Sequence, residues 1–82
     1  MYKIIWDEPA LEQIEKLEIV ISNRIVKKIK ELENEPFTKD IKRLKGSDDF
    51  RLRVGDYRII FSINVNLITI LKVGHRKNIY EH

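Results

Sequence analysis

The chain has 82 residues, 43% of them hydrophobic and 35% charged, with a formal net charge of +3 and no cysteine. This length predicts one domain over residues 1–82, and the lack of cysteine excludes disulfides and thiolate metal sites, so we expect no metal and no cofactor. No apolar run approaches the ~20 residues of a membrane span and no signal peptide is recognisable, which predicts a soluble, cytoplasmic protein without a membrane partner.

Charge is unevenly distributed along the chain. Residues 1–38 carry 6 Lys/Arg against 8 Asp/Glu, whereas residues 39–82 carry 10 against 5. The basic half also contains four interleaved aromatic residues, namely Phe50, Tyr57, Phe61 and Tyr80. Such a segment is typical of a nucleic-acid-binding surface, although many small lysine-rich proteins share the pattern.

Residues 2–6 predict a short strand, which we expect to be covered on more than one side because apolar residues occur at both parities. A first helix begins at Asp7 or Glu8 with Pro9, since proline is favoured at the first helical position and acids in the first turn. Its apolar stripe consists of Leu11, Ile14 and Leu17.

A second helix is predicted between Glu18 and Pro36, because apolar residues recur there at helical spacings. Its stripe consists of Ile21, Ile25, Ile29 and Leu32, widened by Val26. The connection between the two helices is too short for anything but an antiparallel hairpin, which we expect to pack on one face of a sheet.

Residues 39–45 (KDIKRLK) form a basic connection before a turn at residues 46–49. Ile41 and Leu44 are expected to point inward, while the cations of this connection stay in solvent; these are Lys42, Arg43 and Lys45. Surface charge that promotes solubility is the favoured interpretation, and attraction or contact of a polyanion is the alternative.

Residues 50–61 (FRLRVGDYRIIF) predict a β-hairpin, because Gly55 and Asp56 form a turn pair between two runs of β-branched and aromatic residues. A two-residue type II′ turn fixes the cross-strand pairs as Val54–Tyr57, Arg53–Arg58, Leu52–Ile59 and Arg51–Ile60. Side chains alternate between the faces of a strand, so the core face carries Phe50, Leu52, Val54, Tyr57, Ile59 and Phe61.

The other face of this hairpin carries three arginines: Arg51, Arg53 and Arg58. Like charges directly across a strand pair are destabilising, by about 0.2–1 kcal/mol, so this face works against folding unless an anionic partner relieves the repulsion. A solvated outer face, on which arginine stems cover apolar surface, is the alternative interpretation of the same pattern.

A third strand is predicted at residues 67–73, after a loop at residues 64–66. We expect a three-residue loop with Asn66 in the left-handed conformation, because a two-residue loop would bury Lys72. The core face then carries Leu67, Thr69, Leu71 and Val73. The arginine face carries Ile68, Ile70 and Lys72, with Lys72 opposite Arg58.

These elements predict an α+β fold, in which a two-helix hairpin covers one face of a mainly antiparallel four-stranded sheet. The strand–helix–helix–strand–strand–strand order, the hairpin RLRVGDYRIIF and the closing VGHRKNIYEH resemble a RelE-type toxin of the RelE/ParE superfamily over the whole chain. The resemblance implies a toxin of a type II toxin–antitoxin system that cleaves mRNA in the ribosomal A site and inhibits translation. It also implies a cognate RelB-like antitoxin, with which the toxin binds operator DNA.

Carried over by position, the resemblance implies catalytic roles for Arg51, Arg53, Arg58, Arg76 and Tyr80. Arg51 and Arg53 stand where family members often have lysine, and His75 stands where some have another base, so His75 is an alternative acid or base. The candidate RNA or phosphate contacts are Lys42, Arg43, Lys45, Lys72 and Lys77.

RNA cleavage without a metal needs a base at the 2′-hydroxyl, positive charge at the equatorial phosphate oxygens and an acid at the leaving 5′-oxygen. Neighbouring guanidinium groups lower the pKa of a tyrosine from its usual value near ~10, which favours Tyr80 as the base. Arg58 and Arg76 are then phosphate clamps, and Arg51 or Arg53 holds phosphate or donates a proton. Spacing alone instead favours Tyr80 as a cap on the core and His75 as a loop residue.

Two other classes of function stay open at this point. One is a ParE-like inhibitor of DNA gyrase without nuclease activity, which ranks second because such a relative would lack the terminal tyrosine. The other is a non-catalytic partner in antitoxin and operator binding. For any of these, the sheet edge and the apolar residues Ile68 and Ile70 are candidate places for an antitoxin segment to dock.

Overall fold

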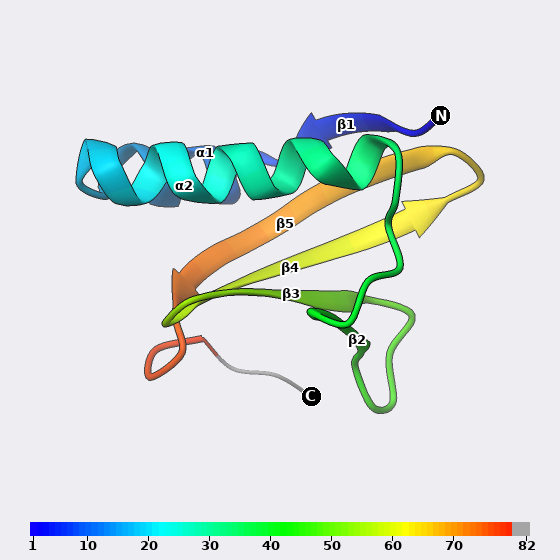
Figure 1. Ribbon diagram of the computed structural model, residues 1–82. Coiled ribbons are helices and arrows are strands. Elements are labelled where there is room, and N and C mark those ends of the chain that lie inside the picture. The colour runs from blue at the N-terminus through cyan, green and yellow to red at the C-terminus, as the bar shows by residue number, and fades with distance from the viewer. Residues whose placement is uncertain (80–82) are drawn as a thin grey trace.

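The computed structural model describes residues 1–79, in which two helices lie on one side of a five-stranded sheet (Figure 1). The elements in chain order are β1 (Lys3–Trp6), α1 (Glu8–Glu15), α2 (Ile19–Lys30), the 3₁₀ turn η1 (Glu31–Glu33), β2 (Ile41–Arg43), β3 (Phe50–Val54), β4 (Tyr57–Asn64) and β5 (Leu67–His75). Among the described residues, no helix is long and apolar enough to cross a membrane.

The sheet has the strand order β1-β5-β4-β3-β2, with β1 parallel to β5 and the remaining neighbours antiparallel. The predicted α+β class and helical hairpin are confirmed, but the sheet has five strands where the sequence predicts four. The additional strand is β2, which pairs Ile41 with Leu52 and Arg43 with Phe50. Three residues between charged neighbours carry no alternation long enough to be recognised as a strand.

The helices bury the stripes that their apolar spacing indicates, with one exception. In α1 the buried residues are Ala10 and Ile14, whereas Leu11 remains 44% exposed, so its assignment to the core is wrong. Ala10, Ile14 and Leu17 follow the i, i+4, i+7 spacing of one helical face, and Leu11 lies at the margin of that face. In α2 the buried residues are Ile25 and Ile29, as predicted.

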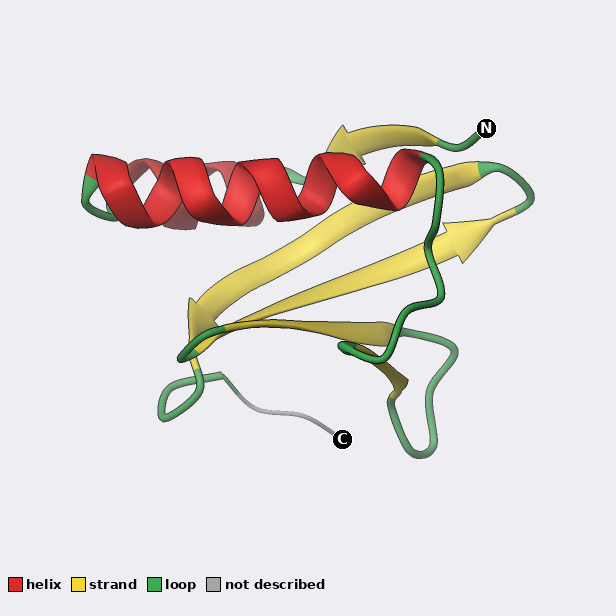
Figure 2. Cartoon of the chain, in the orientation of Figure 1, coloured by secondary structure: helices red, strands yellow, loops and turns green. Residues whose placement is uncertain are grey.

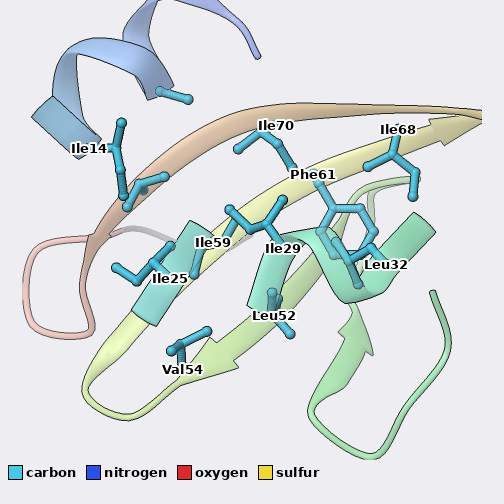
Figure 3. Packing of buried hydrophobic residues seen from close by; sticks show 12 residues of the cluster. Ile14, Ile25, Ile29, Leu32, Leu52, Val54, Ile59, Phe61, Ile68 and Ile70 are labelled. Carbon is cyan, nitrogen blue, oxygen red and sulfur yellow. The ribbon is translucent and has the colours of Figure 1, made fainter. Parts of the chain in front are cut away.

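The core fills the space between the helices and the sheet (Figure 3). Ile25 and Ile29 of α2 and Leu32 of η1 face Leu52 of β3 and Ile59 of β4, all at most 2% exposed. The face of the sheet turned toward the helices is called the helix-side face below, and the opposite one the outer face.

The first strand is covered on one side only, contrary to the sequence-based expectation. Ile4 and Trp6 pack against the core, while Ile5 is 47% exposed. The reason is the position of β1 at an edge of the sheet, where the helices cover the helix-side face alone. Apolar residues at both parities therefore do not mean burial on both faces here.

The β3–β4 hairpin has the predicted register throughout, including the pairs Val54–Tyr57 and Arg53–Arg58. Gly55 has a φ of 58°, which is the backbone geometry that the first central residue of a type II′ turn requires. The arginines and the apolar residues of the hairpin therefore lie on opposite faces, as expected.

The β4–β5 connection differs from the prediction. Asn64 pairs with Leu67, so the loop has two central residues, and Val65 rather than Asn66 has the left-handed φ of 58°. Ile68 and Ile70 are fully buried in the core, which makes them unavailable to an antitoxin in this fold. The assignment of these two isoleucines to the arginine face is thus wrong.

A β-bulge explains how this short loop avoids burying Lys72. The register shifts between Ile60 and Phe61, so that Phe61 pairs with Ile70 and Ile60 pairs with Lys72. Leu71 is the extra residue, and it lets both Ile70 and Val73 face the core. Lys72 lies on the outer face as predicted, but opposite Ile60 instead of Arg58.

Candidate functional site

The outer face of the sheet gathers cations from four strands, β2 to β5. Strand pairing aligns Lys42, Arg51, Ile60 and Lys72 in one row across the sheet. A second row aligns Arg53, Arg58 and Gly74. Two like-charged pairs, Lys42–Arg51 and Arg53–Arg58, are therefore directly opposite each other, each costing about 0.2–1 kcal/mol.

The segment that follows β5 turns onto the outer face, beneath the sheet in Figure 2. A Cβ atom at Gly74 would lie 3.6 Å from the Cβ of Ile79, so this segment passes close over the second row. Ile60 is only 4% exposed although it is not part of the core cluster, so the outer face is covered locally. A hollow of about 430 Å³ opens there, called the outer hollow, lined by Arg51, Arg58, Arg76, Lys77 and Ile79.

The β3–β4 turn fixes the positions of two arginines of this hollow. Nη1 of Arg58 donates hydrogen bonds to the carbonyl oxygens of Gly55 and Tyr57, at 2.8 and 2.9 Å. The backbone N–H of Arg76 donates to the carbonyl of Asp56 at 2.8 Å, and its Nε lies 3.5 Å from Oδ1 of the same residue. Both guanidinium groups are thus held by one turn, which lowers the entropy they lose on binding an anion.

Arg53 lies on the same face as Arg58, but its guanidinium forms an ion pair with a carboxylate. Its Nη2 donates to Oδ1 of Asp40 at 3.1 Å, and its backbone N–H donates to the Asp40 carbonyl at 2.9 Å. Nζ of Lys28 lies 3.9 Å from Oδ2 of the same aspartate. The structure therefore separates Arg53 from the outer hollow, which it does not line.

His75 is placed on the helix-side face, away from the arginines of the outer hollow. It pairs with Tyr57, and the two rings meet edge to face with centroids 5.4 Å apart. Its Nδ1 accepts a hydrogen bond from the backbone N–H of Lys77 at 3.2 Å. Tyr57 packs against the core, as predicted.

The cations of the basic connection are exposed, as predicted, but they do not form one site. Arg43 donates to Oδ1 of Asp48 at 2.8 Å, in the loop at the far end of β3 from the Gly55 turn. Lys45 lies in that loop as well, so both are remote from the outer hollow, whereas Lys42 shares the row of Arg51. Tyr80 lies outside the described residues.

Sequence reasoning missed four residues near the site: Arg24, Lys28, Asp40 and Asp56. Arg24 and Lys28 are four residues apart in α2 and so share one helical face, a spacing that could have marked them as a pair. Nothing in the sequence indicates that this face lies at the hairpin tip. Residues 1–79 contain no group of His, Cys, Asp or Glu side chains that could hold a metal ion.

Known proteins with similar sequence or structure point to one family. Residues 4–80 match the family model described as the ParE toxin of a type II toxin–antitoxin system. Toxin RelE3 of Methanocaldococcus jannaschii is 46% identical over 44 residues, an alignment that spans 52% of this chain and 50% of that protein.

Two crystal structures extend this similarity to nearly the whole chain. The RelE–RelB complex of Pyrococcus horikoshii matches with a TM-score of 0.82 and 29% identity, over 95% of this chain and 98% of that one. The RelB–RelE complex of Methanococcus jannaschii matches with a TM-score of 0.77 and 31% identity, over 93% and 94%. The chain therefore belongs to the ParE toxin family of type II toxin–antitoxin systems, and it has the fold of the RelE toxins.

Proposed function

We propose that this toxin is a ribosome-dependent, metal-independent mRNA endonuclease that cleaves mRNA in the A site and so inhibits translation. The observation that carries the proposal is the outer hollow, where Arg51, Arg58 and Arg76 come from three segments of the chain to one place. Guanidinium groups bind phosphate with two parallel hydrogen bonds, so such a cluster suits a phosphodiester.

The reaction needs few groups from the protein. The 2′-oxygen forms a bond to phosphorus, the bond from phosphorus to the 5′-oxygen breaks, and one proton leaves the nucleophile while another reaches the leaving group. Negative charge grows on the two non-bridging oxygens during this exchange, and fixed donors that meet it lower the barrier. One such donor is typically worth a factor of about 10²–10³ in rate.

Arg58 and Arg76 are suited to this clamping role by the way the turn holds them. The two hydrogen bonds of Arg58 to backbone carbonyls both start at Nη1, which leaves its Nε and Nη2 donors for phosphate. The contact of Arg76 with Asp56 involves Nε, which leaves both Nη groups. In each guanidinium, contacts of one edge with the protein fix the orientation, and the donors of another edge can bind phosphate.

We assign the role of base to Tyr80 and that of proton donor to the leaving 5′-oxygen to Arg51. His75 does not serve as acid or base in this proposal, because its ring lies on the helix-side face against Tyr57. Arg53 is proposed to contact phosphate but not to transfer a proton, since its guanidinium is ion-paired with Asp40. A guanidinium is a poor acid, so we expect slow cleavage of free RNA, and alignment of the mRNA by the ribosome can lower the barrier by ~7–11 kcal/mol.

The proposed partner is a RelB-like antitoxin, since both similar structures described above are complexes with RelB. Apolar side chains on β1, α1 and the start of α2 are exposed in this chain and suit coverage by such a partner; they are Ile5, Leu11, Ile19 and Val20. We further propose that the pair, not the toxin alone, binds operator DNA and regulates transcription.

Inhibition of DNA gyrase is the second candidate, and the description of the matching family as ParE toxins favours it. The cationic outer face is the feature that distinguishes the two proposals, because a protein-binding inhibitor has no need for three arginines gathered around one hollow. A supercoiling assay with purified gyrase and no ribosomes would detect this activity directly.

Primer extension on a defined mRNA, with and without programmed 70S ribosomes, tests the proposed nuclease. We expect cuts confined to A-site codons, and we expect both Arg76→Ala and Tyr80→Phe to lose them. Lys27→Ala is the matched control, because Lys27 is an exposed cation of α2 that lines none of the hollows described here. A folded wild-type protein that leaves the mRNA intact on ribosomes would overturn the proposal and favour gyrase.

A further inference from the structure

A second hollow lies at the tip of the β3–β4 hairpin, between the turn and α2. Its volume is about 540 Å³, and it is called the tip hollow below. Arg58 and Arg76 line both the tip hollow and the outer hollow, so the two are neighbours separated by these side chains. The tip hollow adds Arg24 and Lys28 of α2, two cations that the proposed cleavage does not use.

The guanidinium of Arg24 rests directly on the hairpin turn. A Cβ atom at Gly55 would lie 3.1 Å from its Nη2, 3.3 Å from its Nη1 and 3.4 Å from its Cζ. Any side chain at position 55 would therefore displace Arg24. Because the carbonyl of Gly55 also accepts the hydrogen bond from Arg58, the guanidinium groups of Arg24 and Arg58 both lie at this one glycine.

The charges of the tip hollow are not balanced within the described part of the chain. Its five cations face two carboxylates: Asp40, which pairs with Lys28 and Arg53, and Asp56, which pairs with Arg76. Between residues 1 and 79, neither Arg24 nor Arg58 has an ion-pair partner. Two guanidinium groups that line one hollow without a counter-charge repel each other, and a phosphate would convert that repulsion into binding.

We propose that the tip hollow binds a second phosphate of the RNA strand, next to the one that is cleaved, with Arg24 as its principal contact and Lys28 beside it. The inference rests on the proposed function and deepens it. Because Arg58 and Arg76 stand between the two hollows, a strand with one phosphate in the outer hollow reaches the tip hollow by continuing past them. The ligand is thus the phosphodiester backbone of single-stranded RNA, read without regard to base.

Binding of short RNA to the free protein tests the inference without requiring catalysis. The probe is a fluorescent, single-stranded hexanucleotide with 2′-O-methyl groups, which cannot be cut because the nucleophile is blocked. We expect Arg24→Gln to weaken binding at least three-fold at low salt. The slope of log Kd against log salt concentration should also fall by about 0.7, the change for one lost phosphate contact on a single strand.

Two further variants make the result decisive. Lys27→Gln removes one charge from the same helix outside the tip hollow. Long-range electrostatics alone should then change the affinity by less than about two-fold and the salt slope by less than about 0.2. Arg58→Gln, from the outer hollow, should weaken binding whether or not the inference holds. If Arg58→Gln weakens binding and Arg24→Gln does not, the tip hollow is no RNA site; if neither does, the RNA site of the proposed function fails too.

A parallel measurement with empty 70S ribosomes identifies the source of the phosphate. Arg24→Gln should bind ribosomes without mRNA about as tightly as the wild-type protein does. If the variant loses ribosome affinity but keeps its affinity for the hexanucleotide, Arg24 contacts ribosomal RNA instead, and the assignment to the substrate strand is overturned.

Discussion

The two faces of the sheet are built from the same strands but obey different physical rules. On the helix-side face, Leu52, Ile59 and Phe61 are at most 1% exposed. They pack in one core cluster with residues of α2. On the outer face, the alternate residues of the same strands set Arg53 directly opposite Arg58. One face contributes stability, whereas the other accepts a cost in stability that Asp40 offsets in part at Arg53 and that an anionic ligand would offset further.

The largest effect on the helix-side face is expected from Phe61→Ala. Phe61 is fully buried and stacks on Phe50 with ring centroids 5.6 Å apart, so truncation leaves a cavity and should lower the free energy of unfolding by ~3–5 kcal/mol. Urea unfolding followed by circular dichroism measures this loss. Ile19→Ala, at a side chain that is 70% exposed, is the control and should lose less than about 1 kcal/mol. Similar losses in both variants would mean that the core is elsewhere.

Gly55→Ala probes the turn that joins the two faces. Alanine at a φ of 58° costs about 1–2 kcal/mol, and its methyl group would also push against the Arg24 guanidinium at 3.1 Å. We expect a corresponding loss in the free energy of unfolding, together with weaker RNA binding because Arg24 and Arg58 both rest on this residue. Unchanged stability would show that the turn adopts another geometry.

Asp56→Asn sharpens the role of the turn on the outer face. The backbone hydrogen bond from Arg76 to the Asp56 carbonyl remains, while the charge that holds Nε of Arg76 at 3.5 Å is removed. We expect cleavage on ribosomes to slow about 3- to 5-fold through kcat, with KM nearly unchanged, because an exposed ion pair of this kind is worth up to ~1 kcal/mol.

Asp48→Asn is the matched control for this substitution. Asp48 is likewise an exposed turn aspartate paired with an arginine, Arg43, but it lies at the other end of β3. Its cleavage rate should stay within two-fold of wild type, a margin of about 0.4 kcal/mol. Equal losses in the two variants would argue for a general effect of surface charge instead of positioning of Arg76.

The smallest effect is expected from Gly74→Ala, and it should have the opposite sign. Gly74 does not have a positive φ, and a methyl group there would meet Ile79 at 3.6 Å, which is ordinary van der Waals contact. The substitution lowers the entropy of the unfolded chain, so we expect a gain of ~0.4–1 kcal/mol in the free energy of unfolding. A clear loss would mean that residues 76–79 pack more tightly on the outer face than described.

Local chemistry made the β3–β4 hairpin predictable from sequence, because one glycine fixed its turn and strict alternation fixed its faces. The neighbouring strand was misassigned for a physical reason: a bulge at Ile60/Phe61 lets a two-residue loop coexist with a buried Val73 and an exposed Lys72. Alternation alone offers a choice between two registers and does not reveal an extra residue.

The candidate site was predictable only where it depends on local alternation along the strands. Arg51 and Arg58 were placed on the correct face by alternation within the hairpin. The contacts of Asp40 with Arg53 and of Arg24 with Gly55 join elements far apart in the sequence, so no local pattern indicates them. His75 differs, because alternation from the buried Val73 already places it on the helix-side face.

The central claim is that the outer face is arranged for RNA and not for folding, and Arg58→Ala tests it most directly. The free energy of unfolding and the rate of cleavage on programmed ribosomes would be measured on one preparation. We expect cleavage to fall by about 10²–10³-fold. The free energy of unfolding should change by less than ~1 kcal/mol, because the loss of one exposed and one part-buried hydrogen bond is partly offset by relief of the repulsion from Arg53. Undiminished cleavage, or a loss of stability large enough to explain the lost activity, would contradict the account.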